Sequence, residues 1–133
     1  MKIIITIIIY ALFIVSCAPK LTPPPFEDSN QRFIESFTRH RSNSGFGPKR
    51  ILADLLQRGI VAYVAENYLS SVEIDWEMKV REAWCKKFNQ APADFKTLAK
   101  QTRFLLQRGF EPDSVQRLLQ SVKKEVINEI HDH

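Results

Sequence analysis

The sequence of 133 residues has little of several things that mark specialised folds. Its two cysteines are too few for a disulfide scaffold or a four-thiolate zinc site. With four glycines and seven prolines it is not a collagen-like or linker-like chain, and 44% hydrophobic residues exclude disorder along its whole length. The length allows one small domain or two helical modules, and it is too short for a multidomain enzyme.

A marked excess of positive charge is also absent from most of the chain. The formal net charge is +4, but Lys2 and Lys20 precede the first acidic residue, Glu27. The remaining 17 basic side chains stand against all 15 acidic ones. Nucleic-acid binding would therefore depend on local clustering of basic residues, not on overall charge.

Residues 1–26 differ in kind from the rest and form an apolar leader with a proline-rich linker. Lys2 precedes a stretch at 3–15 that is apolar or aromatic apart from one threonine, and Cys17 follows a small residue. This order is typical of a secretory signal, and residues 14–17 resemble the lipobox of bacterial lipoproteins, whose cysteine is lipidated. Two interpretations stay open: a membrane-anchored envelope lipoprotein modified at Cys17, or an apolar start joined to a cytoplasmic domain.

After residue 30, every periodic segment has helical spacing, and none shows the sustained alternation of a strand. Six amphipathic stripes result, each with apolar residues three or four positions apart. They comprise Phe33, Ile34 and Phe37; Ile51, Leu52, Leu55 and Leu56; Val61, Val64, Ala65, Tyr68, Leu69 and Val72; Trp76, Val80, Ala83, Trp84 and Phe88; Phe95, Leu98, Thr102, Leu105 and Leu106; and Val115, Leu118, Leu119, Val122, Val126 and Ile130. The sequence therefore predicts an all-α fold.

The chain also contains an internal repeat. The sequence Leu-Leu-Gln-Arg-Gly at 55–59 recurs at 105–109, and an apolar residue follows each glycine. Repetition at a fixed offset indicates that one structural unit is used twice. We expect two tandem three-helix repeats, over 27–73 and 74–133, with the apolar leader as a separate segment.

The glycines of this repeat, Gly59 and Gly109, are expected to close the second helix of each unit. Arg58 and Arg108 precede them, where a positive charge is favourable at the helix C-terminus. Glycine adopts a positive φ without steric cost and lets the next apolar residue pack back. Valine at either glycine should therefore lower the free energy of unfolding by more than about 1 kcal/mol.

Two three-helix units closed in this way resemble the RecX family of bacterial RecA regulators. The resemblance covers about residues 27–122 and is carried by 28–33, 35–37, 39–41, 45–51, 55–60 and 103–110. It implies tandem units that lie in the groove of a RecA filament on single-stranded DNA, inhibit strand exchange and coprotease activity, and catalyse no reaction.

The family usually has a further N-terminal three-helix unit, whose place the leader takes here. The resemblance implies a cytoplasmic regulatory protein of DNA repair and the SOS response, with no cofactor and no small-molecule substrate. Two alternatives remain: a lipid-anchored envelope protein with another role, and a truncated relative that has lost RecA regulation.

Positive side chains cluster in one part of the first repeat. Five fall within twenty residues and are opposed only by Asp54, namely Arg39, Arg41, Lys49, Arg50 and Arg58. They predict an electropositive face for an acidic filament groove or, by weak direct contact, for the DNA inside it, whereas ordinary solvated helix ends are the alternative. Reversing Arg41 and Arg50 is expected to weaken filament binding without lowering the melting temperature. The ring of Phe46, expected to be exposed, is a further candidate contact.

The other residues that could bind a ligand or take part in catalysis have simpler interpretations. The segment 45–49 lacks the Gly-Lys-Ser/Thr of a phosphate loop and is interpreted as a flexible start of the second helix. The tail at 131–133 is interpreted as frayed, not as a metal site. Cys85 is expected to be a partly buried structural thiol, and Trp76 and Trp84 to form core between the units. No metal site and no enzymatic activity are expected.

Overall fold

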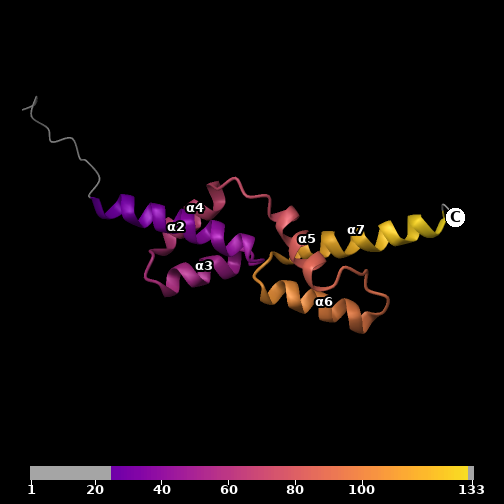
Figure 1. Cartoon of the computed structure of the whole chain (residues 1–133). Helices are drawn as coiled ribbons and strands as arrows, with labels where there is room; N and C mark the ends of the chain where they lie inside the picture. The colour runs from indigo at the N-terminus through magenta and orange to yellow at the C-terminus, as the bar shows by residue number, and fades with distance from the viewer. Residues whose placement is uncertain (1–24, 132–133) are drawn as a thin grey trace, which may run out of the picture.

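The computed structural model describes residues 25–131, and all regular structure in that range is helical. The helices are α2 (Pro25–Asn43), α3 (Pro48–Gln57), α4 (Ala62–Ser71), α5 (Trp76–Lys87), α6 (Phe95–Gln107) and α7 (Pro112–His131). Figure 1 shows two groups of three arranged along one long axis. The predicted all-α fold of two three-helix units is confirmed. Most of the leader, including Cys17, and the end of the tail lie outside the described residues.

The first unit, α2 to α4, is organised around α3. Pro48 occupies the first turn of α3, where its missing N–H costs no hydrogen bond, and both α2 and α4 pack on this helix. The buried core is small, and its members are Ile34, Ile51, Leu55 and Ala65. Partly buried side chains, including Phe37, Leu52 and Ile60, surround it.

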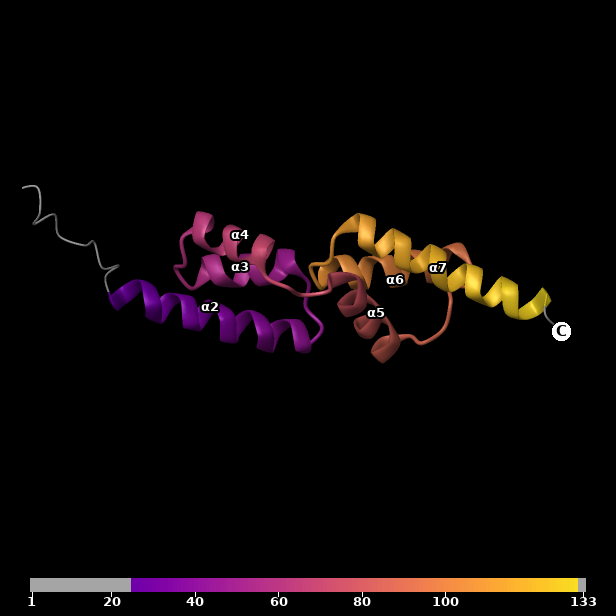
Figure 2. The ribbon, with the colours of Figure 1, turned by 90° about the horizontal axis from the view of Figure 1, so that it is seen from above.

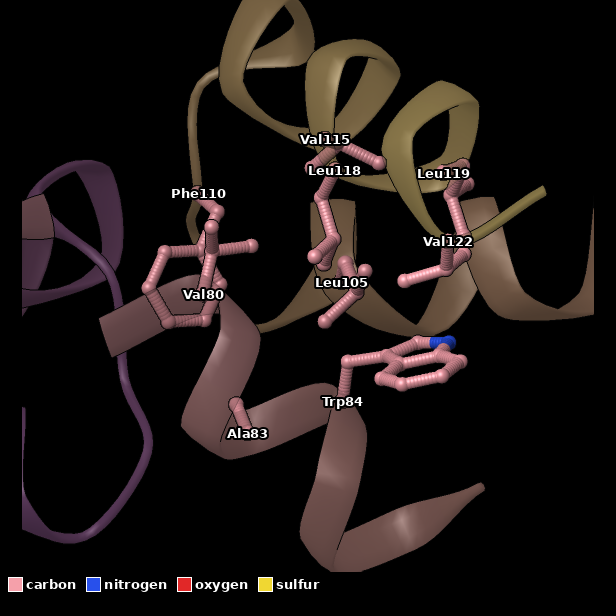
Figure 3. Packing of buried hydrophobic residues seen from close by; sticks show 9 residues of the cluster. All are labelled: Val80, Ala83, Trp84, Leu105, Phe110, Val115, Leu118, Leu119 and Val122. Carbon is pink, nitrogen blue, oxygen red and sulfur yellow. The ribbon is translucent and has the colours of Figure 1, made fainter. Parts of the chain in front are cut away.

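The second unit, α5 to α7, has a larger core to which all three helices contribute (Figure 3). Its buried members are Val80, Ala83, Trp84, Leu105, Phe110, Val115, Leu118, Leu119 and Val122. The indole N–H of Trp84 donates a hydrogen bond of 2.9 Å to the side-chain oxygen of Gln101. The amide nitrogen of Gln101 donates in turn to the carbonyl oxygen of Gln90 at 2.9 Å, so this buried polar group is satisfied.

The helices α3 and α6 end in the same motif. Gly59 has φ +85° and Gly109 has φ +89°, which confirms the predicted left-handed closure. One residue further, the N–H of Ile60 donates to the carbonyl oxygen of Leu55 at 3.1 Å, and the corresponding bond in the second unit is 3.3 Å. These bonds satisfy carbonyl groups that the helix leaves free at its end.

The two units meet end to end, with the N-terminus of α3 against the C-terminus of α6 (Figure 2). The N–H of Gly47 donates to the carbonyl oxygen of Arg108 at 2.8 Å, and the N–H of Lys49 to that of Gly109 at 3.0 Å. Free amides at the positive end of one helix thus pair with free carbonyls at the negative end of the other. The segment 45–49 is therefore a hydrogen-bonded junction and not the flexible helix start that was expected.

Two expectations about side chains of α5 are corrected. Trp84 lies in the core of the second unit, whereas Trp76 packs against the core of the first, so the two rings do not share one core between the units. Cys85 is exposed instead of partly buried. The start of α5 therefore supports the junction, which is also bridged by a hydrogen bond of 3.1 Å from Lys79 Nζ to Asn43 Oδ1.

Five of the six predicted apolar stripes are only partly buried, and three of them contain a member that is more than half exposed. Val61 before α4 is 66% exposed, Phe95 on α6 is 83% exposed and Ile130 on α7 is 69% exposed. Helical spacing shows that residues share a face, but a neighbouring helix covers only part of each face here. The end of α7 extends beyond the rest of its unit (Figure 1). Within residues 25–131, no helix has the length and apolar character that a membrane span requires.

Candidate functional site

Two of the predicted basic residues are held by a buried carboxylate on α3. Asp54 is 7% exposed, and Arg41 on α2 donates to its Oδ2 through Nε at 3.1 Å and also through Nη2. Arg50 forms an ion pair of 3.3 Å with the other oxygen, Oδ1. Removing a buried carboxylate between two guanidinium groups leaves polar groups unpaired, which destabilises a fold. Arg41 therefore ties α2 to α3, whereas the pair of Arg50 lies within α3, and neither arginine is purely a surface charge.

The other predicted bases are placed differently. Lys49 forms an exposed ion pair of 3.0 Å with Glu111 across the junction of the units. Arg39 is exposed and lines a groove of about 410 Å³ between α2 and the segment that leads into α5. It lies close enough to Tyr68 to act on its pKa, which burial and then Glu35 raise and which Arg39 lowers in part.

Phe46 is half-buried and not the exposed ring that was expected. The guanidinium carbon of Arg41 lies 3.8 Å from the centre of its ring, and that of Arg108 lies 4.8 Å from it. The ring is thus held between one arginine from each unit, an arrangement that the attraction of a cation for an aromatic face favours. Phe46 belongs to the junction and orients two guanidinium groups there.

These contacts continue in both directions and form one row. Arg58 lies 4.6 Å from the ring of Phe37, which Arg41 also approaches at 6.0 Å. On the other side of the junction, Arg108 lies 5.1 Å from the ring of Phe104, which Lys87 approaches at 6.0 Å. We call this set the arginine–aromatic row, and its members in spatial order are Arg58, Phe37, Arg41, Phe46, Arg108, Phe104 and Lys87.

Four members of the row were not among the predicted site residues: Phe37, Lys87, Phe104 and Arg108. A signal for Arg108 existed, because it is the repeat counterpart of Arg58 at the end of α6. Phe37 and Phe104 carry no such signal, since as apolar members of helical faces they resemble ordinary core residues. Their place in the row depends on how the helices pack.

The row has the chemistry of a surface that binds anionic groups. A guanidinium that stacks on a ring keeps its N–H edge for other partners, and that planar edge matches carboxylates and phosphates. In Arg41 this edge is already taken by Asp54, so the other basic members of the row are left to meet an external anion. Arg58 and Lys87, at the two ends, are exposed, and Arg108 is half-buried. Within residues 25–131 there is no group of three metal-ligating side chains.

Two family models match the chain, and each takes up one unit. Residues 29–69 match the second three-helix domain of RecX, and residues 76–119 match its third three-helix domain. The matched segments begin in α2 and α5 and together span more than half of the chain.

Curated relatives lead to the same family. A protein of Pseudomonas putida named Regulatory protein RecX is 46% identical over 92 residues, which are 68% of this chain and 59% of the relative. Proteins of the same name from Pseudomonas fluorescens and Pseudomonas syringae are 42% and 40% identical over 92 residues, again 68% of this chain and 59% of each relative. The chain thus spans less than two thirds of the relatives it matches. By its two matched domains, the chain belongs to the RecX family of regulatory proteins.

Proposed function

We propose that this protein binds RecA filaments on single-stranded DNA and inhibits their recombination and coprotease activities. It acts in the cytoplasm as a regulator of DNA repair and catalyses no reaction of its own. Membership of a family of regulatory proteins supports the regulatory part of this proposal. The arginine–aromatic row supports the binding part.

The continuity of the row across both units is the observation that carries the proposal. A filament presents the same groups repeatedly along its length, and a surface that spans two joined units contacts more than one repeat. The hydrogen bonds of Gly47 and Lys49 to the end of α6 fix the units before binding. A pre-formed surface loses less conformational entropy on association than a flexible one. Occupancy of the filament groove is therefore the proposed mechanism.

Exposed bases, two at the ends of the row and Arg39 elsewhere on α2, supply the charge for this contact. Arg39, Arg58 and Lys87 face solvent, and among the described residues none of the three is ion-paired. Acidic side chains of a filament groove or phosphates of the DNA within it are the complementary groups. Contacts of this kind weaken as salt screens the charges.

Co-sedimentation of the full chain with RecA on single-stranded DNA tests the proposal. We expect the chain to pellet with filaments, to remain in the supernatant with DNA alone at physiological salt, and to slow strand exchange in parallel with its binding. Binding should fall as salt is raised from 0.05 to about 0.3 M. A chain that stays in the supernatant at high filament concentration contradicts the proposal. Pelleting that depends on DNA but not on RecA assigns the row to nucleic acid instead.

A further inference from the structure

A second surface lies along α6, from its first residue, Phe95, to Leu106 near its C-terminus. Phe95 is 83% exposed, Leu98 37% and Leu106 41%, so one face of α6 carries an apolar ridge. Thr102 lies in the same line, and its hydroxyl donates to the carbonyl oxygen of Leu98 at 2.8 Å. Its polar group is thereby satisfied inside the helix, and the ridge continues without a free polar group.

The ridge stands between two hollows. On the α7 side, a groove of about 670 Å³ is walled by Val115 and Leu119, with Gln116, Gln120 and Lys123 at its margin. On the other side, a hollow of about 600 Å³ runs past Ala99, Arg103 and Gln107. From Phe95 to Leu106 the ridge is about 16 Å long, which corresponds to three turns of an α-helix.

Basic side chains outnumber acidic ones around this ridge. α6 contains three basic residues, Lys96, Lys100 and Arg103, and no acidic one. All three are exposed, and within the described part of the chain none forms an ion pair. The acidic residue that lines the groove, Asp94, caps α6 by accepting a hydrogen bond from the N–H of Thr97 at 2.6 Å.

We propose that the α6 ridge and its groove bind an acidic amphipathic helix of a partner protein. Apolar side chains of that helix, spaced three and four residues apart, fill the groove beside Phe95, Leu98 and Leu106. Its acidic side chains face Arg103 and Lys123, the basic residues that line the two hollows. Gln116 and Gln120 offer amide groups to the polar edge of the helix. The concave shape, walled by α7, fits a rod and not the flat surface of a membrane.

This site is separate from the arginine–aromatic row and does not depend on RecA binding. A synthetic 16-residue peptide tests it, with leucine at positions 3, 6, 7, 10, 13 and 14 and glutamate or alanine elsewhere. Titration into the isotope-labelled full chain should shift the amide resonances of α6 and of 115–123 and leave those of α2 and α3 in place. The same composition with scrambled leucines, and the peptide with lysine for glutamate, are the control peptides.

Variants of exposed residues give the second readout. We expect Phe95→Ser and Leu106→Ser each to weaken peptide binding at least tenfold. Tyr63→Ser, on the 72% exposed Tyr63 of α4, is the matched control and should bind normally. Arg103→Glu should weaken binding of the glutamate peptide and strengthen binding of the lysine peptide. No shift on α6, equal binding of both peptides, or binding of anionic phosphatidylglycerol vesicles in preference to the peptide overturns the proposal.

Discussion

Gly47 and Gly109 are packed backbone against backbone at the junction of the two units. A Cβ atom on Gly47 would overlap the carbonyl group of Gly109, and a Cβ on Gly109 would overlap the backbone nitrogen of Arg50. The hydrogen bonds between α3 and α6 require this close approach, because any side chain would hold the helix ends apart. Both glycines of the junction thus serve packing between the units, and Gly109 in addition adopts a positive φ.

Alanine should consequently lower the free energy of unfolding by different amounts at the two repeated glycines, Gly59 and Gly109. Gly59→Ala meets no atom within 4 Å, so its cost is that of a positive φ, about 1–2 kcal/mol. Gly109→Ala has the same conformational cost and also displaces Arg50, so we expect a larger loss of unfolding free energy. Urea denaturation of both variants measures the difference. Equal losses would mean that the close approach at Gly109 is relieved without cost.

Asp54 should matter for stability through the two arginines it holds. Asp54→Asn keeps the shape of the side chain but removes its charge, and we expect a loss of about 2 kcal/mol of unfolding free energy. Charge reversal at Arg41 and Arg50 should lower the melting temperature for the same reason, in contrast to the expectation from sequence. Glu66→Gln, at an exposed acid of α4, is the control. If Asp54→Asn leaves the melting temperature unchanged, the Asp54 carboxylate does not stabilise the fold in this way.

The exposed ends of the arginine–aromatic row are the place to test binding without unfolding the protein. The double variant Arg58→Gln, Lys87→Gln should bind RecA filaments at least fivefold more weakly and keep its melting temperature within about two degrees. Lys86→Gln removes an identical charge at the neighbouring position of α5, outside the row, and should bind normally. Equal binding by all three proteins in the co-sedimentation assay would exclude the ends of the row from the interface.

Gln101 should be difficult to replace despite its polar side chain. It is 2% exposed and accepts the only hydrogen bond found for the indole N–H of Trp84 within the described residues. Gln101→Leu leaves that N–H and the carbonyl of Gln90 unpaired, so we expect a loss of about 1–3 kcal/mol. In a Trp84→Phe background the same change should cost less, because the indole N–H is gone. Thermal denaturation of the unchanged protein, the two single variants and the double variant gives the coupling energy between Gln101 and Trp84. A coupling energy of zero would contradict a stabilising hydrogen bond between them.

Glu77 should contribute to the dependence of stability on pH. Hydrogen bonds from Arg117 and from Ser114 lower its pKa below the ordinary value of 4.5. A lowered pKa in the folded state gives stability that is present above the unfolded value and is lost as the pH falls through the folded one. Glu77→Gln should therefore lose less stability than the unchanged protein between pH 6 and pH 3. The difference should be small because Glu77 is half exposed, and it should shrink in 1 M salt.

Local chemistry made much of the fold predictable. The Arg-Gly pair consists of two adjacent residues. It predicts the C-terminus of a helix through the helix dipole and the freedom of glycine at positive φ alone. The start of α5 is likewise set locally, because the carboxylate of Asp75 accepts a hydrogen bond from the N–H of Met78 at 3.0 Å. Features of this kind are decided within about five residues of sequence.

Features decided between helices were not predictable from periodicity. The sequence places Phe46 and Arg108 62 positions apart, and no pattern in either segment indicates that they stack. Similarly, Phe95 and Leu105 belong to one apolar stripe, yet Leu105 is fully buried and Phe95 is 83% exposed. Which part of a stripe is covered depends on the length and tilt of the neighbouring helix, and a single sequence does not record these.

The direct backbone contact between α3 and α6 fixes the distance between the basic residues of one unit and those of the other. A linker would let each unit find its own site, but here the interval between Arg58 and Lys87 is set once, when the chain folds. A polymer whose subunits recur at that interval can be held by both units together, and one with a different pitch by a single unit at a time. Discrimination among polymers would then come from spacing, even where the contacted groups are chemically alike.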